Sequence, residues 1–114
     1  MPKSIGKNVI VVSHNGLEIV ELAGNVATHN DTLSIAKCTV SHPTSEPWLT
    51  LDYDEWMCVT KGTVELHSSL STTVLTVHAG ETVFVGRGER FQPVFPVGNT
   101  EYIAVCLPAF RPDR

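Results

Sequence analysis

Three acidic residues and a tyrosine stand together in the middle of the chain, at Asp52, Tyr53, Asp54 and Glu55. Neighbouring carboxyl groups can divide the roles of acid and base, because the surroundings of each group set its pKa. The cluster therefore predicts a proton-transfer site, with Glu55 and Asp54 as candidate catalytic residues and Tyr53 as a candidate ligand-binding residue. The same residues also fit a solvated turn with Tyr53 packed at its rim, since charged side chains are seldom buried without a partner.

The histidines and cysteines do not form a pattern typical of a metal site. No two histidines have HxH or HxxxH spacing, and no two cysteines have CxxC spacing. Zinc, iron and manganese sites need three or four converging ligands, so we expect no metal and no other cofactor. A less regular site that combines His42 with Glu55 stays open. The three cysteines, Cys38, Cys58 and Cys106, are expected to be reduced and packed as small apolar side chains.

Short runs of β-branched and apolar residues alternate with turn-forming residues along the chain. Eight runs have the length of a strand, and they cover residues 8–12, 17–22, 32–40, 56–60, 63–67, 73–78, 82–85 and 101–107. No stretch has the period of an amphipathic helix. No repeat or linker divides the sequence, so we expect residues 1–114 to form one all-β domain, a sandwich or a barrel.

The composition narrows the classes of partner. The chain has 114 residues and a formal net charge of −4, and its longest apolar stretch is the six residues 102–107. An acidic protein repels the phosphate backbone of nucleic acid, and a membrane-spanning helix needs about 20 apolar residues. We therefore expect neither a nucleic-acid partner nor a membrane. The apolar run at residues 9–12 is too short for a secretory signal, which indicates a cytoplasmic protein.

Two segments resemble the two sequence motifs of the cupins. Residues 47–55, followed by Gly62, are similar to the first motif, in which HxH precedes a glutamate and a turn glycine. Residues 80–91 are similar to the second motif, which runs from a glycine through a proline-x-glycine turn to a histidine. The resemblance implies the cupin fold, an RmlC-like jelly-roll β-barrel.

The positions at which cupins usually bind a divalent metal are changed in this chain. By the resemblance, Leu49, Leu51 and Phe91 replace three histidines, and only Glu55 is retained. Apolar side chains offer no lone pair to a cation, so the resemblance implies a metal-independent protein.

The stretch from Trp48 to Glu55 is more closely similar to the cupin domain of the EutQ ethanolamine-utilisation proteins, which also lacks these histidines. That family is associated with bacterial microcompartments and with acetate kinase activity. The chain has no glycine loop in the strand-to-helix context that binds phosphate, so kinase activity rests on the family analogy alone.

The resemblance directs Glu55 into the barrel, where Leu49, Leu51 and Phe91 would line the pocket. Burial there would raise the pKa of Glu55 and make it useful as an acid or base near neutral pH. Alternatively, Glu55 has a structural role and caps a turn or pairs with Lys37. Lys37 is a candidate catalytic partner if it points inward, whereas at the rim its ammonium group would reach water.

Trp48 and Arg90 are the remaining candidate ligand-binding residues. A guanidinium group at the pocket mouth, from Arg90 or Arg87, can hold an anionic group with two hydrogen bonds, although surface arginines in turns commonly have no such role. Trp48 either walls the pocket or anchors an interface.

Two functions follow from these observations. The first is a metal-independent small-molecule-binding protein or enzyme that uses a pocket around Glu55. The second is a non-catalytic structural or interaction module, associated with microcompartments as EutQ proteins are, in which Leu49, Leu51 and Phe91 fill the barrel as a packed core. We expect a homodimer, because an all-β domain has strand edges to cover.

Overall fold

The structure, a computed structural model, describes residues 1–111, and in this range the chain forms strands, turns and loops. The strands are β1 Val9–His14, β2 Leu17–Ala23, β3 Ser34–Val40, β4 Thr44–Ser45, β5 Leu49–Thr50, β6 Asp54–Lys61, β7 Thr63–Ser68, β8 Ser71–His78, β9 Thr82–Val85, β10 Arg90–Phe95 and β11 Thr100–Leu107. Within residues 1–111, no helix is long and apolar enough to span a bilayer.

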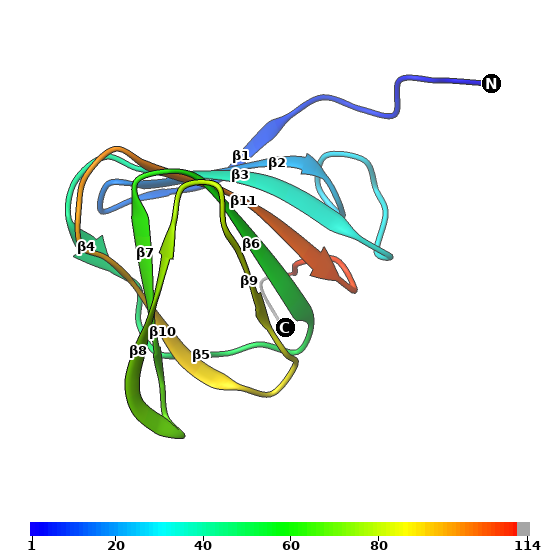
Figure 1. Ribbon diagram of the computed structural model, residues 1–114. Coiled ribbons are helices and arrows are strands. Elements are labelled where there is room, and N and C mark those ends of the chain that lie inside the picture. The colour runs from blue at the N-terminus through cyan, green and yellow to red at the C-terminus, as the bar shows by residue number, and fades with distance from the viewer. Residues whose placement is uncertain (112–114) are drawn as a thin grey trace.

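The strands form two antiparallel sheets that enclose the centre of the molecule (Figure 1). One sheet has six strands in the order β1-β2-β3-β11-β6-β9, and the other has the order β4-β10-β7-β8 with β5 also paired to β10. The expected all-β jelly roll is confirmed. Hydrogen bonds do not join the two sheets into one closed barrel, so side-chain packing holds the sheets together.

All eight runs expected from the sequence overlap strands, but the sequence pattern did not identify β10 or the two-residue strands β4 and β5. Pro93 interrupts β10 and lacks an N–H group for the hydrogen-bond ladder. The structure accommodates Pro93 because the neighbouring strands β4 and β5 leave residues 46–48 between them, where regular pairing with β10 is interrupted. Pro93 still accepts a hydrogen bond from the Glu46 N–H, at 3.0 Å.

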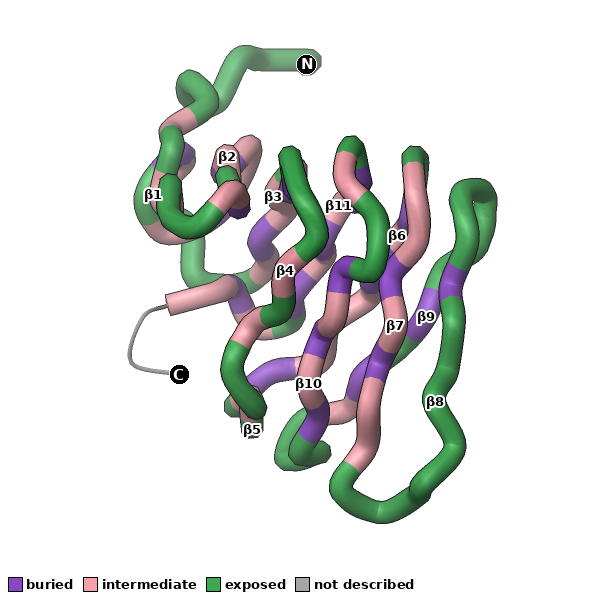
Figure 2. Tube along the Cα trace, turned by 90° about the vertical axis from the view of Figure 1, so that its left-hand side faces the viewer, coloured by how far each residue is buried: buried purple, intermediate pink, exposed green. Residues whose placement is uncertain are grey.

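The core consists of alternate residues on the inner faces of both sheets. Met57 and Val59 of β6 face Val64 and Leu66 of β7, and all four are buried. Figure 2 shows this burial along the inner strands, in contrast to β8, which is almost entirely exposed. The period-two pattern of the sequence thus sorts the side chains between core and solvent.

The turn between β6 and β7 depends on Gly62. Its backbone has a φ of 72°, a conformation that costs little for glycine and more for other residues. A Cβ atom at this position would also overlap the side chain of Thr100, which is buried and donates a hydrogen bond to the Val97 carbonyl at 3.2 Å. Gly88 has a similar φ of 83°, but its missing Cβ atom would meet open space.

We predict that Gly62→Ala destabilises the protein by about 2–4 kcal/mol, because backbone strain adds to overpacking. The matched variant Gly88→Ala carries the backbone strain alone, and we expect it to cost about 1 kcal/mol. Urea unfolding of both variants measures the difference. Equal losses would show that the contact with Thr100 does not constrain this turn.

Candidate functional site

A cavity of about 360 Å³ lies between the two sheets. Inward-facing residues of β2, β3, β11 and β6 form one wall, and the segment from residue 44 to 51 forms the other together with Pro93 and Phe95 of β10. Most of the lining is apolar, with Met57, Ala104 and Leu49 as typical members. The cavity therefore offers a mostly apolar space with some polar groups on its walls.

Glu55 borders this cavity from the start of β6. Its neighbour across the sheet is Cys106 of β11, whose Sγ lies 3.9 Å from Glu55 Oε1 and donates a weak hydrogen bond. Burial raises the pKa of Glu55 from 4.5 to about 8, and repulsion from Glu46 adds to the rise. Because burial disfavours the charged form, Glu55 is mostly protonated at neutral pH.

Glu46 faces the same cavity from the opposite wall, and the sequence analysis did not identify it. Its backbone is fixed by hydrogen bonds on both sides: its N–H donates to Pro93 O, and its carbonyl accepts from Gln92 Nε2 at 3.0 Å. Burial raises the pKa of its carboxyl group. The cavity therefore holds two glutamates, from different walls, whose pKa values are both raised by burial.

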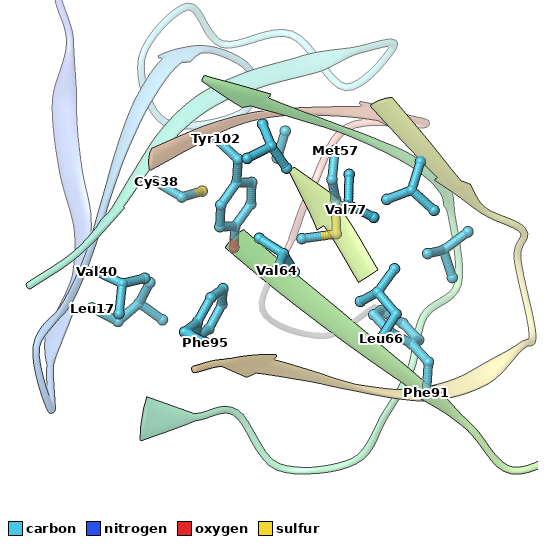
Figure 3. Packing of buried hydrophobic residues seen from close by; sticks show 14 residues of the cluster. Leu17, Cys38, Val40, Met57, Val64, Leu66, Val77, Phe91, Phe95 and Tyr102 are labelled. Carbon is cyan, nitrogen blue, oxygen red and sulfur yellow. The ribbon is translucent and has the colours of Figure 1, made fainter. Parts of the chain in front are cut away.

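Cys38, Tyr102 and Phe95 form the middle of the cavity lining (Figure 3). The Tyr102 ring stacks on Phe95 with 6.0 Å between the ring centroids, and its hydroxyl group hydrogen-bonds to the Cys38 thiol. Burial raises the pKa of the Cys38 thiol far above its usual range and that of Cys106 to about 12. Both thiols therefore stay protonated and unreactive, as expected for cysteines that pack as apolar side chains.

Lys37 does not reach Glu55. It occupies the outer face of β3, where its Nζ lies 3.2 Å from Glu101 Oε1 and half of the side chain is exposed. The expectation that Lys37 assists Glu55 is therefore wrong, as is the alternative in which these two residues pair. Strand alternation is the physical reason, because Ala36 and Cys38 take the inward positions on either side.

Asp54 also lies outside the cavity lining. Its Oδ1 accepts a hydrogen bond from the Arg87 N–H at 2.8 Å, which ties the start of β6 to the turn after β9. Successive side chains of a strand point to opposite faces of the sheet, so Glu55 faces the cavity and Asp54 faces away from it. The proposed division of acid and base roles between them does not match this geometry.

The predicted ligand-binding residues separate into two groups. Leu49, Leu51 and Tyr53 line the cavity with Glu55, and Tyr53 makes an edge-to-face contact with Phe110 at 6.3 Å. Phe91 does not line this cavity. It is buried at the other end of the core near Leu66 (Figure 3) and borders a smaller hollow together with Arg90.

Trp48 and Arg90 interact with each other rather than with the cavity. The Arg90 guanidinium carbon lies 5.6 Å from the centre of the Trp48 ring, within the range of a cation–π contact. Both residues are exposed. The expectation that they contribute to the Glu55 pocket is therefore wrong, and residues 44–47 close that side instead.

The described residues contain no group of three or more His, Cys, Asp or Glu side chains that could share a metal ion. His42 is exposed, and its Nδ1 lies 3.2 Å from the Pro43 carbonyl oxygen. It does not line the cavity that contains Glu55, so the alternative His42–Glu55 site is not formed.

The sequence and the fold resemble those of known proteins. No protein-family model matches the sequence. The chain is 32% identical over 110 residues to the protein named Endoribonuclease YbeY of Myxococcus xanthus; the match covers 94% of this chain but only 36% of that protein.

Among solved structures, an RmlC-like cupin from Shewanella frigidimarina matches 94% of this chain and 88% of its own, with a TM-score of 0.76 and 20% identity. The described chain is therefore a protein of the RmlC-like cupin fold. The fold also matches the Clostridium difficile EutQ protein, with a TM-score of 0.69 and 22% identity over 83% of this chain and 70% of that one. The resemblance inferred from the sequence is thus confirmed at the level of the fold.

The raised pKa of Glu55 predicts a specific dependence of stability on pH. Between about pH 4.5 and 8 the unfolded chain releases the Glu55 proton while the folded chain retains it. Stability contributed by this group is complete below pH 4.5 and is lost as pH rises to about 8, by up to about 1.4 kcal/mol per pH unit.

Glu55→Gln removes this ionisation, so we expect the variant to gain stability relative to the wild type as pH rises from 5 to 8. Urea unfolding at several pH values measures the difference. Glu18→Gln, an exposed change on β2, is the control and should follow the wild type. A constant difference between Glu55→Gln and the wild type would contradict the burial of an ionisable Glu55.

Proposed function

We propose that the chain binds a small, mostly apolar organic molecule in the cavity between its sheets, with Glu55 as the polar contact. The observation that carries this proposal is the position of the Glu55 carboxyl group, one of three glutamate side chains on the wall of a mainly apolar cavity of about 360 Å³. Pockets for small molecules have volumes of roughly 300–1,000 Å³ and combine apolar walls with few polar groups. The cavity lies at the lower end of this range.

Glu55 supplies the chemistry of the proposed site. In its neutral form the carboxyl group donates a hydrogen bond to an oxygen or nitrogen atom of the ligand. With a pKa of about 8, it exchanges its proton readily near neutral pH, which is the property of a general acid or base. Any reaction at this site would be a proton transfer to or from a ligand atom beside Glu55, without a metal.

The cavity argues against a purely structural module. That alternative requires the apolar replacements Leu49 and Leu51 to fill the interior. Instead they pack at the edge of the core and leave space in front of Glu55. A fully packed core would not leave a space of this size beside a carboxyl group.

RNA cleavage is not part of this proposal. The name of the Myxococcus xanthus relative describes a protein of which this chain spans about a third. Three glutamates, Glu21, Glu46 and Glu55, line the cavity, and the whole chain has a net charge of −4. The net negative charge disfavours the binding of a phosphate backbone.

Binding can be tested with a thermal-shift screen of neutral organic molecules at pH 6.5, followed by calorimetry on those that stabilise the protein. We expect Ala104→Phe to abolish binding, because the ring would occupy the cavity that Ala104 lines. Ala79→Phe places the same ring in the exposed turn before β9 and serves as the control.

Glu55→Leu should weaken a ligand with a hydrogen-bond acceptor by about tenfold, equivalent to the loss of one hydrogen bond. Failure of every neutral ligand to bind, or equal binding by the wild type and Ala104→Phe, would contradict the proposal.

A further inference from the structure

Apolar side chains lie on the outer face of the six-stranded sheet as well as on its inner face. Strand alternation turns them away from the core, because residues beside them, such as Met57 and Ala104, point inward and are buried. The strands that carry them, β3, β11, β6 and β9, are neighbours in the sheet (Figure 1). We refer to five of these outward side chains as the outer strip: Ile35 of β3, Ile103 and Val105 of β11, Trp56 of β6 and Phe84 of β9.

Strand pairing aligns four members of the outer strip in one row across the sheet. Ile35 lies opposite Val105, and Val105 lies opposite Trp56. Trp56 in turn lies opposite Phe84, and their ring centroids are 5.0 Å apart. The Phe84 side chain is 51% exposed, and the other three are partly exposed. The row is therefore a continuous apolar surface across four strands.

The other sheet has a polar outer face, as a sheet that faces solvent normally does. On β7 the outward residues are Thr63, Glu65 and His67. Gln92 of β10 lies opposite His67, and Thr76 of β8 lies opposite Glu65. Single apolar residues on a surface are ordinary, but a contiguous apolar patch marks an interaction site. The difference between the two sheets indicates that the outer strip is covered by a partner.

The charged residues beside the outer strip neutralise each other within one chain. Lys37 lies on β3 opposite Ile103, and its Nζ is 3.2 Å from Glu101 Oε1. Glu101 Oε2 also accepts a hydrogen bond from Thr60 Oγ1, at 2.7 Å. A second copy of this chain therefore meets no excess of like charge here, although the whole chain has a net charge of −4. A strongly charged partner would find no complementary charge at this pair.

A second copy also fits the shape and size of this face. Two sheets can pack face to face about 10 Å apart, as they do inside sandwich folds. Six strands roughly 4.8 Å apart, with about seven residues of roughly 3.3 Å each, span about 650 Å². Two copies would bury up to about 1,300 Å² in total, within the range of about 1,200–2,000 Å² that is usual for stable interfaces.

We propose that two copies of the chain form a symmetric dimer in which the outer faces of their six-stranded sheets pack together. The outer strip forms the centre of the interface, and the Lys37–Glu101 pair lies beside it. The same surface serves both copies, as two-fold symmetry requires. This inference goes beyond the proposed function, because no member of the outer strip lines the cavity. It gives the homodimer expected from the sequence a defined surface.

Sedimentation velocity over a range of protein concentrations tests the proposal. We expect the wild type to change from monomer to dimer at micromolar concentration. Val105→Lys places a charge in the outer strip, and it should weaken dimerisation by about 100-fold or more, since that charge would lose its water in the interface. The matched control Val94→Lys makes the same change on the outer face of β10, opposite Glu65, and should dimerise like the wild type.

Labelling of Cys58 with a maleimide provides a second measurement on the wild type alone. Cys58 is partly exposed on the outer face of β6, opposite Ile103, whereas Cys38 and Cys106 are buried. The labelling rate of Cys58 should fall as the protein concentration rises through the range of dimer formation. This measurement stands even if Val105→Lys fails to fold, which circular dichroism would show.

Several results would overturn the proposal. A wild type that stays monomeric at high micromolar concentration has no such interface. A dimer that persists in folded Val105→Lys, or that leaves the labelling rate of Cys58 unchanged, uses a different surface. Equal loss of dimer in Val105→Lys and Val94→Lys would remove the link to the outer strip. A monomer that instead binds vesicles of neutral phosphatidylcholine would assign the strip to a lipid surface. None of these results bears on ligand binding in the cavity.

Discussion

The burial of the Glu55 carboxyl group is the constraint on which the rest of the site depends. A strand directs alternate side chains to one face, so the position that brings Met57 and Val59 into the core also brings Glu55 to the cavity. Apolar surroundings then disfavour its charge and raise its pKa. The proposed binding role would give this ionisable group a function in a mainly apolar cavity.

The cavity is a consequence of how the second sheet is built. Strands β4 and β5 have two residues each, and the chain between them crosses the mouth of the sandwich. Pro93 of β10 faces this interruption, so the sheet does not form a continuous ladder there. The interruption brings Glu46 to the cavity, opposite Glu55. A regular pair of strands at this position would have filled the space with paired side chains.

Periodicity in the sequence was sufficient for most of the fold. The eight predicted runs fall in strands, but they did not show which face of β3 points inward, so the direction of Lys37 stayed open until the structure placed it on the outer face. The sequence pattern did not identify β10, because Pro93 interrupts the run of strand-forming residues. The strand tolerates Pro93 because its pairing with β4 and β5 is interrupted at that point. The resemblance to cupins supplied the fold and the inward direction of Glu55, both of which the structure reproduces.

The sequence predicted less of the site than of the fold. Glu55, Leu49, Leu51 and Tyr53 were found because they are close together along the chain. Glu46, Glu21 and Tyr102 line the same cavity as Glu55 only because distant strands pair, and no local pattern reports that pairing. The sequence did contain a signal for Glu21, because this acidic residue lies on the same face of β2 as the apolar residues Leu17 and Ile19. An acid on the apolar face of a strand is a reason to expect a polar site in the core.

The most direct test of this account is an NMR titration of the Glu55 side-chain carboxyl carbon in the ligand-free protein, assigned by comparison with Glu55→Gln. Burial of Glu55 predicts a midpoint near pH 8, with the carboxyl group neutral at pH 6. A midpoint near 4.5 would show that Glu55 is solvated as an ordinary surface glutamate and would contradict the proposed role of the cavity.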